Sequence, residues 1–171
     1  MKNIIIDDKK YKLVPVEEPQ VQEKARTGWE RVKAGELFFC VYCECTQGDM
    51  HDYSGDLSNA IYKSGNYFND KQLCNDVGRA VSIYLRMLRW QAENDVPVEL
   101  REPVIKKWYI RYHIPTKELY SSYVEANLGV FGIYFSTKEK AEECIKVFES
   151  DLIWLHTQFY HRLDGKGVDN A

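Results

Sequence analysis

Hydrophobic and polar residues alternate along this chain with two different periods, and each period predicts a different kind of element. Apolar residues recur every three or four positions in residues 70–93 and again in residues 137–160, which predicts two long helices. Between them, residues 94–107 carry Pro97 and Pro103 and break the helical pattern. The other apolar runs are short and rich in β-branched and aromatic residues, so they predict strands.

Predicted strands precede each of the two helices. Residues 36–45 predict one strand, residues 46–58 have the composition of a loop, and residues 60–62 are expected to pair back as a second strand. The strands expected ahead of the second helix are residues 108–114, 118–124 and 130–134.

The start of the chain has its own pattern. Residues 4–6 and 11–14 are apolar runs on either side of a polar turn, which predicts a β-hairpin. Residues 15–28 are polar and contain Pro15 and Pro19, so we expect a linker or a short helix there.

Two octapeptides are near copies of each other: GNYFNDKQ, residues 65–72, and GIYFSTKE, residues 132–139. They lie 67 positions apart, and the same shift aligns the apolar stripes of the two predicted helices. The aligned pairs are Cys74 with Ala141, Val77 with Cys144, Val81 with Phe148, Leu85 with Leu152, Leu88 with Leu155 and Ala92 with Phe159. We expect these positions to form the core-facing stripe of each helix.

Each octapeptide predicts the exit of a strand joined to the start of a helix. Asn69 and Ser136 stand where a helix N-cap belongs, and Gln72 and Glu139 follow three residues later, as in a capping box. The Tyr-Phe pair ahead of the cap supplies a ring to bury, and the glycine permits a bend of the backbone. Neither octapeptide has the glycine-rich pattern that cradles phosphate, so the sequence favours a folding role.

These elements predict an α+β protein made of two related β-β-(β)-α units, with antiparallel sheets and one long helix each, plus the N-terminal β-hairpin. The expected divisions are residues 1–28 for the hairpin and linker, 29–95 for the first unit, 96–107 for a linker, 108–162 for the second unit and 163–171 for a flexible tail.

Composition narrows the function classes. The 171 residues are 44 % hydrophobic and 29 % charged, an ordinary globular mixture, and the net charge of −3 does not favour nucleic acid as an obligatory partner. No apolar run approaches the ~20 residues of a membrane span, and the first residues do not resemble a secretory signal. The five cysteines are irregularly spaced, as expected of free thiols in a reducing cytoplasm.

Cys40, Cys43 and Cys45 invite comparison with a zinc site. On a strand, Cys40 would point to one face and the other two to the opposite face, and only His51 and His113 are further candidate ligands. We therefore expect no metal and no cofactor. A thiol or metal enzyme that uses these cysteines is kept as an alternative.

Neither the acidic residues nor a search for hydrolase motifs indicates catalysis. Asp49, Asp52 and Asp56 surround His51 without the spacing of a calcium loop, so a solvated acidic loop is expected. The sequence contains neither G-x-S-x-G nor H-E-x-x-H. It predicts a protein that is not an enzyme and has no catalytic residues.

One face of the first long helix stands out as a candidate partner-binding surface. Arg79, Ile83, Arg86 and Trp90 fall opposite the predicted core stripe, and Arg and Trp are enriched at binding hot spots. The residues expected to extend this surface into a basic patch are Arg89, Lys106, Lys107 and Arg111. The alternative is that this face packs against another part of the same chain.

Several stretches resemble a family of small proteins from phages and prophages of Firmicutes: GNYFNDKQ, LRMLRWQAEN, WYIRY and GIYFSTKEKAEECI…DLIWL. Members of that family carry G-N-x-F-x-T-x-E-E-A ahead of one helix and I-Y-F-S-S-K-E-x-A-E-x-A-I ahead of the last. The resemblance covers roughly residues 29–160 and departs from the family at Gln72-Leu73-Cys74. It implies a fold signature and brings no catalytic residues.

Small phage proteins of this kind include anti-CRISPR proteins, so the resemblance implies a non-enzymatic accessory protein in the cytoplasm of a bacterial host. We expect it to bind and inhibit a host defence protein, in the sharpest version an RNA-guided CRISPR effector nuclease. The alternative is a nucleic-acid-binding accessory protein that uses the basic helix face. A homodimer would use the same exposed apolar residues.

Overall fold

The computed structural model describes residues 3–6, 9–12, 27–126 and 132–163 of the chain. The elements are β1 (Asn3–Ile6), β2 (Lys9–Lys12), β3 (Leu37–Val41), β4 (Gln47–His51), α1 (Asp56–Lys63), α2 (Lys71–Asn94), β5 (Lys107–His113), β6 (Glu118–Val124), α3 (Lys138–Trp154), the π-helical turn η1 (Leu155–Phe159) and α4 (Tyr160–Leu163). Most of the predicted linker at residues 15–28, nearly all of the predicted tail and part of the predicted strand at residues 130–134 lie outside the described residues.

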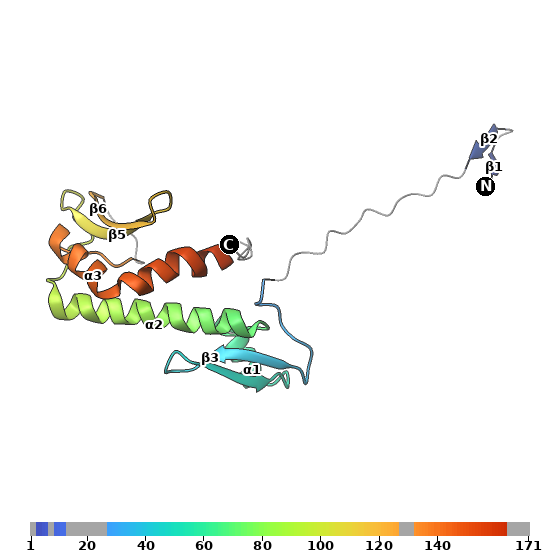
Figure 1. Cartoon of the computed structure of the whole chain (residues 1–171). Helices are drawn as coiled ribbons and strands as arrows, with labels where there is room; N and C mark the ends of the chain where they lie inside the picture. Colours follow the sequence, from blue (N-terminus) through green and yellow to red (C-terminus); the bar gives the residue numbers. More distant parts are fainter. Residues whose placement is uncertain (1–2, 7–8, 13–26, 127–131, 164–171) are drawn as a thin grey trace.

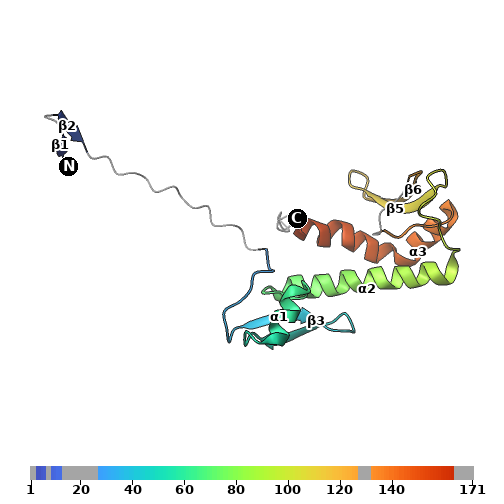
Figure 2. The same ribbon diagram turned by 180° about the vertical axis from the view of Figure 1, so that it is seen from behind.

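The protein is α+β, with antiparallel two-stranded sheets. β1 pairs with β2, β3 with β4, and β5 with β6, and each strand joins its neighbour in the chain. The long helix α2 lies between the β3–β4 pair on one side and α3 on the other (Figures 1 and 2). The β3–β4 pair packs on one side of its N-terminal half, whereas α3 runs along the opposite side and carries the β5–β6 pair.

The second strand of the first hairpin is not where the sequence placed it. Residues 47–51, expected to be loop, form β4, and residues 60–62, expected to be a strand, lie in α1. Gly48 gave this segment the composition of a loop. In the structure the glycine belongs to the strand, because the ring of Tyr42 occupies the place that a side chain at 48 would take. In α1, Ser58 is buried, and Ile61 packs against the cluster of Phe38, Cys40 and Tyr67. Ser58 and Ile61 are three residues apart and so lie on the same face of the helix.

Both long helices begin one residue later than predicted. Asp70 caps α2, and its carboxylate accepts from the backbone N–H of Leu73 at 2.7 Å. Thr137 caps α3, and its hydroxyl accepts from the N–H of Lys140 at 3.2 Å. Since each cap moves by one residue, the capping boxes predicted with Gln72 and Glu139 do not form.

The two predicted caps are engaged elsewhere. The side-chain amide of Asn69 donates to the carboxylate of Glu30 at 3.2 Å. The backbone N–H of Ser136 donates to the carboxylate of Asp95, the C-cap of α2, at 2.8 Å, and the Ser136 hydroxyl also bonds that carboxylate. Ser136 therefore fastens the start of the second helix segment to the end of α2.

Each octapeptide adds a short bridge to its own hairpin. Phe68 pairs antiparallel with Phe39 of β3 through two backbone hydrogen bonds of 2.7 and 2.9 Å. Phe135 pairs in the same way with Trp108 of β5, at 3.0 and 2.7 Å. Both phenylalanines are buried, so the segment that leads into each helix is held between a strand and the core.

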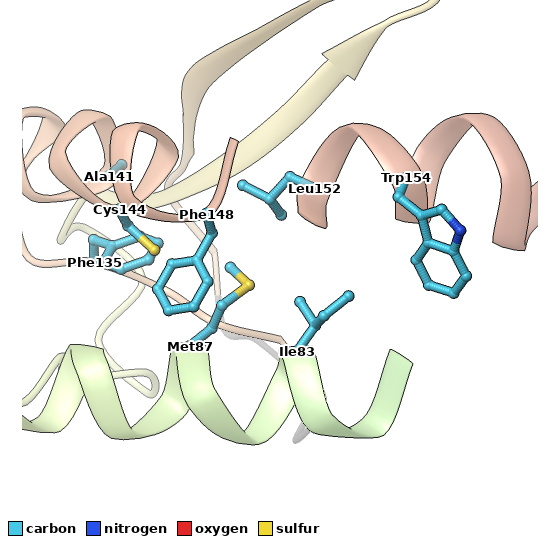
Figure 3. Packing of buried hydrophobic residues seen from close by; sticks show 8 residues of the cluster. All are labelled: Ile83, Met87, Phe135, Ala141, Cys144, Phe148, Leu152 and Trp154. Carbon is cyan, nitrogen blue, oxygen red and sulfur yellow. The ribbon is translucent and has the colours of Figure 1, made fainter. Parts of the chain in front are cut away.

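The main core lies where α2 and α3 face each other (Figure 3). Ile83 and Met87 of α2 meet side chains of α3 and of the segment before it; those residues are Phe135, Ala141, Cys144, Phe148, Leu152 and Trp154. The stripe predicted for the second helix is correct, because its first four members are buried and Leu155 and Phe159 pack against them. α3 bends at Phe148 and continues through η1 into α4.

The stripe predicted for the first helix is correct over only half its length. Cys74 is buried and Val77 packs beside it against β3, whereas Val81 and Leu85 are 41 % and 53 % exposed. Gly78 marks the closest approach to the hairpin, because a Cβ there would lie 2.5 Å from the carbonyl oxygen of Cys45. Beyond Gly78 the helix runs past the hairpin, and the stripe loses its cover.

Candidate partner-binding surface

The face of α2 chosen from the sequence as a partner surface is the face that α3 covers. Ile83 is fully buried at the centre of the α2–α3 core. Trp90 is half-buried, and its ring meets that of Phe135 edge-on at 6.1 Å between centroids. Internal packing, the alternative to a binding surface, therefore accounts for both apolar members of this face.

The two arginines of that face form the rim of the helix pair. Arg79 and Arg86 both reach Asp151 of α3, at 3.3 and 2.5 Å, and each side chain remains nearly half exposed. The guanidinium of Arg79 lies 4.0 Å from the ring centre of Trp154, and that of Arg86 lies 5.6 Å from Phe148. One carboxylate thus offsets two cations, which weakens this rim as a phosphate-binding patch.

The remaining predicted basic residues do not form one continuous patch. Lys107 is fully buried, and its ammonium donates to the backbone carbonyls of Glu102 and Ile105, the latter at 3.1 Å. Lys106 lies over the ring of Tyr123 at 4.5 Å. Arg89 and Arg111 are exposed, on α2 and β5 respectively. Of the residues chosen from the sequence, Ile83 and Lys107 lie too deep to contact a partner.

A different surface of α2 is open. The predicted stripe continues beyond the β3–β4 hairpin, on the side of α2 away from α3, with the exposed residues Val81, Leu85 and Ala92 and the half-buried Leu88; we call these four the open stripe. Arg89 lies on an exposed helical turn beside Leu85 and Leu88. The open stripe is apolar with a cation at its edge, the composition of a protein-binding face.

The loop predicted to be acidic and solvated holds a buried carboxylate that pairs with a partly exposed arginine. Asp52 is fully buried and receives two bonds from the guanidinium of Arg31, at 2.8 and 3.1 Å. The Tyr67 hydroxyl donates to the same carboxylate at 2.9 Å and accepts from the backbone N–H of Val32. Arg31 holds the pKa of Asp52 well below its usual range, whereas burial and Asp52 raise the pKa of Tyr67 to about 12.

This network is structural. It joins the segment before β3, the end of β4 and the first octapeptide through three side chains. His51, which the sequence placed in the same acidic cluster, points elsewhere and bonds the carbonyl of Gly35 through Nδ1 at 3.0 Å. Asp49 and Asp56 are exposed and make no ion pair within the described residues.

The cysteines are not arranged on one strand as predicted. Cys40 is buried in β3, but Cys43 and Cys45 lie in the turn before β4, because β3 ends at Val41.

The thiol pKa values are raised. Burial raises the pKa of Cys74 to about 11 and the pKa of Cys144 to about 12, and a hydrogen bond to Glu44 raises the pKa of Cys43. Raised pKa values oppose the thiolate that nucleophilic chemistry requires. Within the described residues, no three His, Cys, Asp or Glu side chains gather closely enough to hold a metal ion.

No family model, curated protein or solved structure matches this chain. Its surfaces are therefore interpreted from their own residues. In the part of the chain that the structure describes, every helix is too short or too polar to cross a membrane.

One signal in the sequence locates the open stripe. α2 is apolar on two opposite faces: Ile83, Met87 and Trp90 on one, and Val81 and Leu85 on the other. A helix on the surface of a small domain needs only one apolar face. The second face therefore indicates either a further layer of the same chain or a partner, and for the C-terminal half of α2 the described residues supply no further layer.

Proposed function

We propose that this protein acts by binding another protein, without catalysis, and that the open stripe of α2 is the contact surface. The exposure of Val81 and Leu85 on a rigid 24-residue helix carries the proposal. A helix presents such a stripe to an apolar groove, with anchors one turn apart. Arg89 at the edge calls for an acidic residue beside that groove.

The resemblance to phage accessory proteins supports a more specific partner. On this proposal the chain is made in the cytoplasm of a bacterial host and inhibits a host defence protein, most specifically the nuclease of an RNA-guided CRISPR effector. Inhibition by a non-enzymatic protein requires stoichiometric binding, through occlusion of a nucleic-acid site or a block of a conformational change. The tyrosine-rich, mildly acidic surface suits such an occluding role better than direct binding to a phosphate backbone.

Replacing Leu85 by glutamate tests the surface and the partner together. We expect the wild-type protein to co-purify with a type II effector complex and to suppress its DNA cleavage at stoichiometric amounts. Leu85→Glu places a charge in the middle of the open stripe, so it should weaken binding by roughly 30-fold or more, the size of a hot-spot loss. The measurement is a pull-down combined with a cleavage assay across a range of inhibitor concentrations.

Val147→Glu is the matched control, because Val147 is 59 % exposed on α3. It introduces the same charge on the other long helix and should leave inhibition unchanged. Undiminished cleavage at large molar excess of the wild-type protein would remove the nuclease proposal. Retention of the free protein on DNA, with an affinity that falls steeply with salt, would favour the nucleic-acid alternative instead.

We further propose that the two β-β-α units are related copies. Three correspondences support this relationship at the same spacing of 67 residues: the glycines Gly65 and Gly132, the bridging rings Phe68 and Phe135, and the caps Asp70 and Thr137. α1 lies between hairpin and octapeptide in the first unit only, among the described residues. On this proposal, duplication supplied a second helix to cover α2, and the open stripe is the part that it leaves uncovered.

A further inference from the structure

A pocket of about 430 Å³ opens beside the main core. α2, β5, residues 132–135 and the α3–η1 segment form its walls. Met87, Phe135 and Leu152 belong to the main core and make its floor. The volume lies within the range that protein pockets use for small organic ligands.

The walls are aromatic and uncharged. Four tyrosines line the pocket, from four different segments: Tyr84, Tyr109, Tyr134 and Tyr160. Among the described residues, the lining contains no Asp, Glu, Lys or Arg, and burial lowers the pKa of its one imidazole, His156. A charged guest would lose its hydration there without gaining a counter-ion, whereas a neutral aromatic guest would meet ring faces and a few hydrogen-bonding groups.

The aromatic rings of the lining are arranged in pairs. Tyr109 and Tyr134 meet edge-on at 6.2 Å between centroids, as do His156 and Tyr160 at 5.3 Å. His156 is held from behind, because its ring stacks on Tyr112 at 5.2 Å and 11°. Within the described part of the chain, these tyrosine hydroxyls and the His156 ring form no hydrogen bond with another side chain, so they are candidates to bond a guest.

The helix widens into a π-helical turn where it borders the pocket. Leu155–Phe159 form the π-helical turn η1, which supplies Leu155, His156 and Phe159 to the lining. A π-helical turn is less favourable than α-helix, and such turns are concentrated at functional sites. Here the wider turn sets His156 and Phe159 around one cavity.

We propose that this pocket binds a small, uncharged aromatic molecule. The proposal goes beyond protein binding by the open stripe. The pocket lies on a different part of the protein, where α2 faces η1, and it requires no partner protein. Ring stacking supplies the affinity, and the tyrosine hydroxyls and His156 select among neutral guests by hydrogen bonding.

Indole is the probe, and methyl NMR signals are the readout. Titration of the full chain with indole should shift the methyl signals of Met87, Ile110 and Ile133 in a saturable manner. The expected Kd is on the order of 1 mM, as for other fragment-sized ligands. Indole-3-acetate adds a carboxylate that none of the described lining residues neutralises, so it should bind roughly 10-fold more weakly.

Two variants locate the site. Tyr160→Ala removes a half-exposed ring at the rim, and Phe159→Ala removes a ring supplied by η1; each should weaken indole binding roughly 3- to 10-fold. Tyr53→Ala, in the first unit and 79 % exposed, is the control and should leave binding unchanged. Because Tyr160 lies at the surface, its variant stays folded even if Phe159→Ala does not. The proposal is overturned if indole gives no saturable shifts at these methyls, if the carboxylate analogue binds as well as indole, or if Tyr160→Ala has no effect.

Discussion

Replacing Ile83 by alanine is expected to lower the free energy of unfolding by roughly 2–5 kcal/mol. Ile83 is fully buried, and its side chain lies among Met87, Phe148 and Leu152 between the two long helices (Figure 3). The substitution removes apolar contacts and leaves a cavity that the two helices cannot easily close. Urea unfolding followed by circular dichroism measures the loss.

Leu85→Ala is the matched control, on the same helix and two residues away. Leu85 is more than half exposed on the open stripe, so its loss should change the free energy of unfolding by about 0.5 kcal/mol or less. The pair of variants decides which face of α2 belongs to the core. If Leu85→Ala proved as costly as Ile83→Ala, the stripe predicted from the sequence would be the core face along the whole helix and the open stripe would not exist.

The two long helices differ in how well the sequence predicted their core faces. In α3 the apolar positions form one stripe, and Ala141, Cys144 and Leu152 are buried as expected. In α2 both faces are apolar, and periodicity alone cannot say which face is covered at each turn. The answer depends on how far the β3–β4 hairpin extends and on the path of α3, which are tertiary facts.

Local signals were correct to within a residue where the competing contacts are also local. β6 has its predicted bounds. Both long helices begin one residue later than predicted, because Asn69 and Ser136, the predicted caps, bond partners far away in the sequence. The predicted position of the second strand was wrong for two reasons. A glycine and polar side chains in β4 conceal the alternating pattern of that strand, and Ala60, Ile61 and Tyr62 have the composition of a strand although they lie in α1.

The candidate site shows the same limit. Arg79 and Arg86 were chosen because arginine is common at binding surfaces, but the carboxylate that they share, Asp151, is more than 60 residues away. No sequence periodicity links the two arginines to Asp151. The sequence did indicate that α2 carries a second apolar face in addition to the one that packs against α3. The fold then determined which residues of that second face stay exposed.

Replacing Asp52 by asparagine is expected to destabilise the first unit strongly and to change how its stability depends on pH. The substitution removes the carboxylate that binds Arg31 and Tyr67 and leaves both donors facing an amide inside the protein. Asp52 and Tyr67 are buried, and a buried donor that loses its charged acceptor is among the more damaging single changes, whereas the partly exposed Arg31 can be rehydrated. A fall in Tm of roughly 5–10 °C is expected.

The pH dependence follows from the lowered pKa of Asp52. Its carboxylate has a lower pKa in the folded protein than in the unfolded chain, so the folded state favours the ionised form. The stabilisation is present above the unfolded pKa of about 4 and is lost as pH falls through the folded pKa. The wild-type protein should therefore lose stability progressively below about pH 4, and Asp52→Asn should lose less over the same range.

Asp49→Asn is the control for the loss of one negative charge, because Asp49 is exposed on β4, three residues before Asp52. It should leave Tm nearly unchanged and keep the acid-dependent loss. Some acid dependence should persist in Asp52→Asn as well, since hydrogen bonds from Thr27 lower the pKa of Glu30 to about 2. The measurement is urea unfolding from pH 2 to pH 7 for all three proteins. If Asp52→Asn and the wild type lost stability in parallel as pH falls, the Arg31–Asp52–Tyr67 network would not be the acid-sensitive link that joins β4 to the first octapeptide.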